Sequence, residues 1–401
     1  MLIGWDWASQ SHDITVLGDQ GEVAERFAVN HDEAGFERAL ARMRRHGEPR
    51  DLPIAIERPN GVVVERLLAA GHPVVPIHPN AFNAARSRWG AARAKSDPGD
   101  SYRLADYLRT DGHRLRRLQP LDQQTRQLQA IVRMRDDHVE ARVAAVNQLQ
   151  ALLDSCWPGA ATIFARLDSD IALNFLDRYS TPDSARHLGE VRLAAFLKRN
   201  SYPGKRPVSE LLRRLRGAPV ACNLLEPEVL TDLVRNQVRV VRTLRETIAE
   251  MDHAIAAALL EHPKAKLLST LPRIGDCVNL AQLISELGPI LDGSLDVDHA
   301  AAQCGASPVT KSSGLNHGVH FRWAANNHAR KALAIFADNS RHSSRWAANL
   351  YARHAALQKR HPHVIRILMR AWLRVIWACW HTNTAYSPNL HGAESRFAPA
   401  A

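Results

Sequence analysis

The amino-acid sequence predicts an α/β domain followed by mainly helical regions. Short apolar strands alternate with helical segments up to about residue 118, and apolar residues recur at every seventh position in two later segments. Lys and Arg outnumber Asp and Glu by 13 to 2 from Ala301 to the C-terminus, whereas the first 300 residues hold 39 of each sign. These observations divide the chain into an α/β domain at 1–118, a helical region at 119–263 and a basic C-terminal domain at 264–401.

The first domain begins with two segments that are typical of strands. "LIGWDW" and "DITVLGD" are separated by a polar turn and predict a hairpin, with Asp6 on its first strand. "LPIAIE" predicts a buried strand that ends at Glu57, and "HPVVPIHP" predicts another. Between them, "GVVVERLLAAG" predicts a helix closed by glycine. A further helix is expected at 101–109, with Asp97 and Asp100 at its start.

Two long helices are expected in the helical region, on either side of an insertion at 157–226. Their apolar ladders are spaced by seven residues: Val132, Val139, Val146 and Leu153 in the first helix, and Val234, Val241, Ile248 and Ile255 in the second. Such ladders fit an antiparallel pair, an intermolecular coiled coil or two amphipathic helices of an ordinary bundle. Arg135, Arg142 and Gln237 interrupt the ladders, and these alternatives therefore stay open.

The basic C-terminal domain favours a polyanionic partner, most simply nucleic acid, over a merely soluble basic surface. Its arginines are interleaved with aromatic residues, including Trp323 and Trp346. "LLSTLPRIGDCVNLAQLISELG" predicts two helices joined by a tight turn, close to a helix–hairpin–helix, whose backbone amides can contact phosphate. Arg273 stands where such a hairpin usually has glycine, and only Gly275 is retained. An ordinary packing turn is the alternative. The last helix, from about His363 to Trp380, is expected to be amphipathic, with its buried face formed by Ile365, Leu368, Trp372 and Ile376.

Composition argues against several classes of protein. The five cysteines show no CxxC spacing, which argues against a zinc ribbon or a disulfide framework and for a reducing compartment. The N-terminus is too polar for a signal peptide, and we find no apolar run of 18 residues. We therefore expect a cytoplasmic protein without membrane contact.

Four carboxylates carry the strongest chemical signal. Asp6 lies in an apolar strand, where an unpaired acid is costly, and Glu57 ends a later strand. Asp97 and Asp100 are three residues apart, which puts both on one face of a helix. A capping role for the aspartates is the alternative. Ribonuclease-H-like nucleases assemble a site for Mg²⁺ from the same kinds of residue in the same order: an Asp on a strand, a Glu on a later strand and a pair of Asp residues on a helix.

Nearly the whole chain resembles one known family, the DEDD transposases of the insertion-sequence family "one-ten", which are bridge-RNA-guided DNA recombinases. The N-terminal half carries the blocks "GWDWASQSHDITV", "IAIERPNG" and "AKSDPGDSYRLADYLR". The C-terminal half carries "LPRIGDCVNLAQLISELG", "GASPVTKSSG" and "FRWAANNHARKAL". The order and separation of these blocks make the resemblance specific. It implies a resolvase-like first domain with a ribonuclease-H-like fold and a second transposase domain.

The resemblance also implies a role for individual residues. Asp6, Glu57, Asp97 and Asp100 match the four DEDD positions and would bind Mg²⁺. Ser313 precedes the glycine of the Ser-Gly block and would be the nucleophile. Its attack would link the protein covalently to DNA. The cationic residues expected to contact nucleic acid are Arg273, Lys311, Arg322, Arg330 and Lys331. The implied partners are donor DNA, target DNA, a noncoding guide RNA and further copies of the chain, as a dimer or tetramer that combines the two domains across subunits.

Two departures from the family pattern stand out. Arg58 and Pro59 follow Glu57 where a small residue and glycine are commoner, and Arg273 replaces the hairpin glycine.

The residues also allow two other functions. Without a nucleophilic Ser313, the four carboxylates would make a Holliday-junction-resolvase-like hydrolytic nuclease. If the acids are only caps, the chain is a nucleic-acid-binding scaffold. The absence of a GxxxxGK[ST] motif fits rejoining chemistry that needs no ATP.

Overall fold

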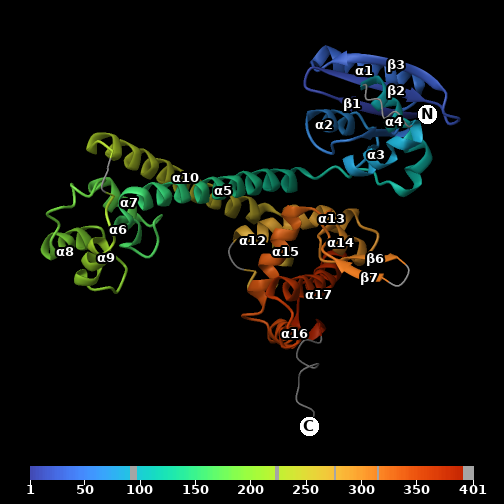
Figure 1. The fold of residues 1–401 in the computed structure, drawn as a ribbon. Helices are drawn as coiled ribbons and strands as arrows, with labels where there is room; N and C mark the ends of the chain where they lie inside the picture. Colours follow the sequence, from blue (N-terminus) through green and yellow to red (C-terminus); the bar gives the residue numbers. More distant parts are fainter. Residues whose placement is uncertain (91–96, 222–224, 275–276, 314–315, 392–401) are drawn as a thin grey trace, which may run out of the picture. The chain divides into compact units, whose positions relative to one another are not determined.

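The structure, a computed structural model, describes residues 1–90, 97–221, 225–274, 277–313 and 316–391 (Figure 1). Contacts group the chain into two units, Met1–Leu121 and Asp122–Ala401, and each is described by itself. The first unit is built on a mixed sheet and the second is mostly helical, which confirms the predicted α/β plus α fold class. The division into three domains stays a prediction.

Unit 1 contains a five-stranded sheet in the order β3-β2-β1-β4-β5. The predicted hairpin is confirmed, because β1 (Leu2–Trp7) pairs antiparallel with β2 (Ser11–Leu17), which pairs antiparallel with β3 (Val23–Asn30). The two later predicted strands are also present. β4 (Ile54–Ile56) runs parallel to β1, and β5 (Val74–Pro76) runs parallel to β4.

Helices cover both faces of this sheet. The helices of unit 1 are α1 (Glu33–Met43), α2 (Val62–Ala69), α3 (Pro79–Ala85) and α4 (Asp97–Asp111), with short 3-10 turns at Arg44–His46, Pro49–Asp51, Arg86–Trp89 and Gly112–Arg114. Ile3 and Trp5 of β1 point into a core with α1 and α2. On the opposite face, Ala55 and Val75 pack with α3 and α4. The alternation of side chains along each strand explains why one strand serves both cores.

The backbone of α4 crosses β1 in close contact at Gly4. A Cβ atom at Gly4 would lie 1.9 Å from the carbonyl oxygen of Ser101. The contact is fixed by a 2.8 Å hydrogen bond between the hydroxyls of Thr15 and Ser101. Any side chain at Gly4 would therefore push α4 off the sheet.

We expect Gly4→Ala to lower the free energy of unfolding of unit 1 by about 3 kcal/mol, because overpacking at backbone contact cannot be relieved by a side-chain rotation. Chemical denaturation followed by tryptophan fluorescence measures this loss. Gly293→Ala is the control, since an added Cβ there would meet nothing within 4 Å apart from its chain neighbours and its own helix backbone. Equal stability of Gly4→Ala and wild type would contradict the close crossing.

Two long antiparallel helices organise unit 2, α5 (Gln123–Cys156) and α10 (Pro227–Glu261), which lie side by side in Figure 1. The Gln124 side chain donates to the carbonyl of Glu261 at one end, and that of Gln237 donates to the carbonyl of Ala145 near the other. Of the three arrangements left open by the sequence, the structure thus shows an antiparallel pair within the chain. Coiled-coil packing in detail stays a prediction.

The apolar ladders are buried unequally. All four predicted positions of the second helix, Val234, Val241, Ile248 and Ile255, are buried. In the first helix Val132 and Leu153 are buried, whereas Val139 and Val146 are only half-buried. Val146 nevertheless packs against one of the two cores of unit 2. The ladder of α5 is therefore less deeply buried than that of α10.

One of these cores is formed by the insertion and the other by the C-terminal region. The first contains α6 (Pro158–Thr162), α7 (Asp170–Arg178), α8 (Glu190–Arg199) and α9 (Val208–Gly217). The second packs against the N-terminal part of α5 and contains α11 (Ala265–Leu268), α12 (Cys277–Gln282), the π-helical turn Leu283–Leu287, α13 (Gly288–Gly293), α14 (Val297–Gln303), α15 (Asn327–Ser340), α16 (Arg345–Ala356) and α17 (His361–Thr382), followed by α18 (Pro388–His391).

The predicted C-terminal amphipathic helix is confirmed as α17. Its predicted core residues Ile365, Leu368, Trp372 and Ile376 are all buried. Within the described ranges, no helix combines the length and apolar character that a membrane crossing requires.

Candidate active site

Three of the four predicted carboxylates line one pocket of unit 1. Asp6, Glu57 and Asp100 face a cavity of about 290 Å³. Asp6 is on β1, Glu57 directly follows β4, and Asp100 lies in the first turn of α4. The side chain of Asp97, the fourth predicted ligand, lies outside what the structure describes. Asp6 and Asp100, 94 positions apart in sequence, thus line the same pocket, because the ends of β1 and β4 and the start of α4 meet there.

The sheet register explains this convergence. Trp5 of β1 pairs with Ile56 of β4, and the next residues along these parallel strands are Asp6 and Glu57. Asp6 shares the face of Gly4, because residues two apart on a strand point the same way. That is the face on which α4 lies, so the close crossing at Gly4 brings the start of α4 to the same pocket.

A fourth described carboxylate, Asp13, lines the same pocket and was missed by the sequence analysis. It lies on β2 directly opposite Asp6. Like charges directly opposite on a sheet are destabilising, unless a cation is close. The alternation of side chains along β2 shows only that Asp13 shares a face with Thr15. The register of the hairpin is also needed to show that Asp13 lies opposite Asp6.

Asp100 is held by two arginines. Its two carboxylate oxygens accept hydrogen bonds from Arg86 at 2.8 Å and from Arg103 at 2.7 Å. The Asp100 carboxylate is buried, and both arginine side chains are largely so. These are charge-assisted contacts of the stronger kind. Arg86 also lines the pocket and was not anticipated as part of the site.

The donor chemistry of the pocket suits a hard divalent cation, since carboxylate oxygens are the ligands such cations prefer. The arrangement does not yet form a closed metal site. Among the described residues, no group of three or more His, Cys, Asp or Glu side chains is placed to share one metal ion. Asp100 is instead paired with Arg86 and Arg103, and the Asp97 side chain lies outside the described part of the chain.

We expect Asp100→Asn to lower the free energy of unfolding of unit 1 by about 3 kcal/mol, because it leaves two poorly exposed guanidinium groups without their carboxylate. Chemical denaturation is the measurement. Asp19→Asn is a matched control, since Asp19 is exposed and contacts only the N-terminal amine in the described structure. An unchanged midpoint for Asp100→Asn would mean that the two ion pairs contribute nothing to the fold.

Ser313, the predicted nucleophile, is the last residue of a strand in unit 2. β6 (Val309–Ser313) pairs antiparallel with β7 (Asn316–His320) in a two-stranded ribbon. Ser313 is exposed, and the ribbon geometry places it on the same face as Lys311 and opposite to that of Ser312. A hydroxyl at the tip of an exposed ribbon is accessible to a large substrate. The glycine of the predicted Ser-Gly block, Gly314, lies outside the described residues.

Three of the predicted nucleic-acid contacts brace the fold in this structure. Arg322 donates to the carbonyls of Ser307 and Pro308 at 3.1 and 3.3 Å. Arg330 donates to the carbonyl of Arg322 at 2.6 Å, and burial is the main cause that lowers its pKa. The Lys331 ammonium pairs at 2.9 Å with the buried Asp136 of α5. The charge of these side chains is therefore partly engaged within the protein.

Arg273 has an unusual backbone conformation. Its φ angle is +45°, in the left-handed region that glycine adopts without cost. This explains why glycine is common at this position of such a hairpin, and it shows that arginine keeps the turn despite the strain. The Arg273 side chain is exposed. Gly275, the retained glycine, lies outside the described residues.

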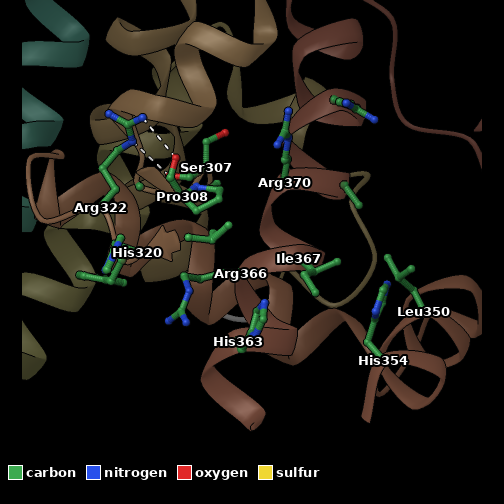
Figure 2. A pocket seen from close by; sticks show the side chains of 16 residues that line it. Ser307, Pro308, His320, Arg322, Leu350, His354, His363, Arg366, Ile367 and Arg370 are labelled. Atoms are coloured by element: carbon green, nitrogen blue, oxygen red, sulfur yellow. Dashed lines mark hydrogen bonds between the residues drawn. The ribbon is translucent and has the colours of Figure 1, made fainter. Parts of the chain in front are cut away.

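A second cavity, of about 520 Å³, lies beside the ribbon in unit 2 (Figure 2). Its lining comes from the segment before β6, the end of β7 and the helices α16 and α17. The charged or titratable side chains among its lining residues are all basic: His320, Arg322, His354, His363, Arg366, Arg370 and Arg374. No carboxylate is among the lining residues that the structure describes.

Comparison with known proteins agrees with this two-part arrangement. Residues 3–158 match the family model for the DEDD domain of IS110 elements, described as a transposase, and residues 265–352 match the model described as transposase of the IS116/IS110/IS902 family. The chain belongs to the IS110 family of transposases. As an IS110-family transposase it is an enzyme that acts on DNA, and its acidic pocket and its ribbon each fall within one of the two matched segments.

Relatives of this IS110-family transposase extend over most of its length. It is 29% identical over 98% of both chains to the "Mini-circle putative transposase for IS117" of Streptomyces coelicolor. It is 24% identical over 96% of both chains to the "Insertion element IS900 uncharacterized 42 kDa protein" of Mycobacterium paratuberculosis. A third relative, "Putative transposase y4uE" of Sinorhizobium fredii, is 32% identical over 49% of this chain and 56% of its own.

Proposed function

We propose that this transposase is a metal-dependent DNA recombinase that cuts and rejoins strands through a covalent phosphoserine intermediate. The observation that carries the proposal is the gathering of Asp6, Glu57 and Asp100 around one pocket of an α/β unit, in a chain that also exposes Ser313 at a ribbon tip. The strand order β3-β2-β1-β4-β5 supports a ribonuclease-H-like first domain.

In this proposal Asp6, Glu57, Asp97 and Asp100 hold Mg²⁺. The support is the donor set of the pocket, in which Asp13 adds a further carboxylate. Asp100 would use an oxygen that now accepts from Arg86, and the Arg86 guanidinium lines the same pocket, where a DNA phosphate would be an alternative anionic partner. When bound, the metal supplies Lewis-acid stabilisation of negative charge on a phosphoryl oxygen.

Ser313 supplies the nucleophile. Its Oγ forms a bond to the phosphorus of one phosphodiester, the proton leaves Oγ, and a bridging deoxyribose oxygen departs and takes up a proton. In rejoining, a deoxyribose hydroxyl attacks the same phosphorus and Ser313 regains its hydroxyl. The count of phosphoester bonds is unchanged, so no external energy source is needed. Lys311, on the same face of the ribbon, would offset the charge of the phosphate.

The partners proposed for this reaction are donor and target DNA, a noncoding guide RNA that pairs with both, and further copies of the chain. The basic C-terminal domain supports binding of nucleic acid. Joining two duplexes needs at least two nucleophiles, which supports a dimer or tetramer. We place this activity in the cytoplasm, at the nucleoid, because that is where a bacterial DNA substrate lies.

The test combines purified protein with labelled donor and target DNA, RNA transcribed from the flanking noncoding DNA, and either Mg²⁺ or a chelator. Recombination predicts joined donor–target products that require both Mg²⁺ and the RNA. Joined products without RNA would contradict guidance, and products in chelator would contradict a metal-dependent reaction.

A hydrolytic nuclease is the alternative that the pocket supports, because its carboxylates are sufficient to activate water without Ser313. It predicts free cleaved ends and no joined products in the same assay. Those ends would be insensitive to the loss of Ser313.

A further inference from the structure

The basic cavity beside the ribbon contains positive charge that the fold does not neutralise. Arg370 pairs with Asp298 at 2.9 Å, and Arg374 approaches the same carboxylate at 4.0 Å. In the part of the chain that the structure describes, neither Arg366 nor His363 has a carboxylate within ion-pair distance. The guanidinium of Arg366 lies near that of Arg330 instead, which contributes to lowering the pKa of Arg330. A cluster of this kind is stabilised by an anionic ligand.

Figure 2 shows how these groups are arranged. Arg322 and His320 lie on one side, His354 lies on the other, and Arg366 and His363 of α17 lie between them. The hydrogen bonds from Arg322 to the carbonyls of Ser307 and Pro308 fix the wall of the cavity. Arg366 projects from a helix whose neighbouring residue Ile365 is buried in the core. Arg366 and His363 are thus held on a packed helix.

An aromatic platform adjoins the basic cavity. Phe321 lines the cavity, with the guanidinium of Arg366 at 5.2 Å and that of Arg330 at 4.8 Å from its ring centre. Trp323 is not itself a lining residue, but its ring centre lies 4.9 Å from that of Phe321, with the two rings nearly perpendicular, and 82% of its surface is exposed. An indole that is this exposed offers aromatic surface for stacking. Together with the nearby guanidinium of Arg366, it matches the combination that binds unpaired nucleotides.

The volume of the cavity limits the size of the ligand that it can hold. A volume of about 520 Å³ lies in the range of pockets for small organic ligands. It is too small for a double helix, whose major groove alone is about 12 Å wide. A phosphate with one or two unpaired nucleotides fits. Strand exchange by a transposase exposes such nucleotides in DNA.

We propose that this cavity binds a short unpaired segment of DNA, with a base stacked on Trp323 and the adjoining phosphates held by Arg366 and His363. The proposal takes only the DNA substrate from the family and does not depend on the nucleophile or the metal. It gives the ribbon a neighbouring site that holds a separated strand. Arg322 and Arg330 position this site through the contacts they make within the protein.

The test is the binding of a fluorescently labelled eight-nucleotide oligo(dT) to the full chain in chelator, followed by anisotropy as a function of salt. Loss of one stacked base is worth about 1–3 kcal/mol, so Trp323→Ala is expected to weaken binding by about 5- to 150-fold. Arg366→Gln is expected to weaken binding and to reduce the slope of log K against log salt by about 0.7, the value for one phosphate contact of a single strand.

Two controls make the result specific. Trp323→Phe keeps an aromatic face and should retain most of the affinity. Arg239→Gln removes an exposed arginine of α10, outside the cavity, and should leave both affinity and slope unchanged. Circular dichroism shows whether each variant is folded.

Equal binding by wild type, Trp323→Ala and Arg366→Gln would overturn the proposal, as would an equal loss in Arg239→Gln. Tighter binding of an RNA of the same length and sequence pattern would overturn the assignment to DNA. The outcome is separable from that of the proposed recombination. An oligo(dT) that binds normally to a protein unable to form a DNA adduct would refute the phosphoserine and leave this site in place.

Discussion

Ser313→Ala is expected to abolish the covalent protein–DNA adduct and to reduce strand joining at least about 10³-fold. Removal of an attacking nucleophile leaves only binding and charge stabilisation, which retain a small part of the rate enhancement. The fold should be unaffected, because Ser313 is exposed at the end of β6. The measurement is a denaturing gel of end-labelled DNA after reaction with wild-type and variant protein, in which an adduct migrates at protein mass.

Ser312→Ala is the matched control for this prediction. The two serines are adjacent, but strand geometry turns them to opposite faces of the ribbon. We therefore expect Ser312→Ala to retain the adduct. An adduct that persists in Ser313→Ala and disappears in Ser312→Ala would show that the nucleophile had been assigned to the wrong serine.

Asp6→Asn should abolish metal-dependent cleavage, with a loss on the order of 10³-fold, because metal-ion stabilisation of the transition state is worth several kcal/mol. The amide has the shape of the carboxylate but is a poorer ligand for Mg²⁺. Stability should be largely retained, because Asn keeps the shape and the hydrogen-bonding capacity of the side chain and removes a like charge opposite Asp13. Cleavage rate, Mn²⁺ binding and the denaturation midpoint are measured on the same samples.

The combination of lost activity and retained stability separates a metal ligand from a structural acid. Asp19→Asn serves as the control for a surface aspartate of the same unit. If Asp6→Asn destabilised the unit and kept its cleavage rate, Asp6 would be a structural residue. Full activity with full stability would remove Asp6 from the site altogether.

The elements that carry the acids were predictable from local patterns. The hairpin of β1 and β2 follows from two apolar segments around a polar turn, and Glu57 ends a short buried strand. The burial of α17 follows from its 3.6-residue period. In each of these cases the signal is contained in a few neighbouring residues, which is why the sequence was sufficient.

The surroundings of the site were not predictable in the same way. The pairing of Asp6 with Asp13 depends on the hairpin register, and the capture of Asp100 by Arg86 depends on how α4 lies relative to α3. Lys331 pairs with Asp136, 195 residues away, which no local pattern reveals. Charge counts therefore identified a basic domain but did not show which cations the fold itself engages.

The basic cavity illustrates the same limit. Arg366 and His363 belong to α17, whose apolar period was recognised, but a period does not show what the polar face of a helix meets. The cavity arises because that face meets β7 and α16. Trp323 was noted among the aromatic residues of the basic domain, and its exposure could be known only from the fold.

The most direct test of the central claim is to identify the residue that carries DNA. Wild-type protein reacts with donor and target DNA in the presence of Mg²⁺ and flanking RNA, the denatured adduct is digested with nuclease and protease, and mass spectrometry locates the nucleotide phosphate. We predict that it is attached to Ser313. A nucleotide on any other residue, or cleaved DNA without any attached protein, would contradict the phosphoserine mechanism.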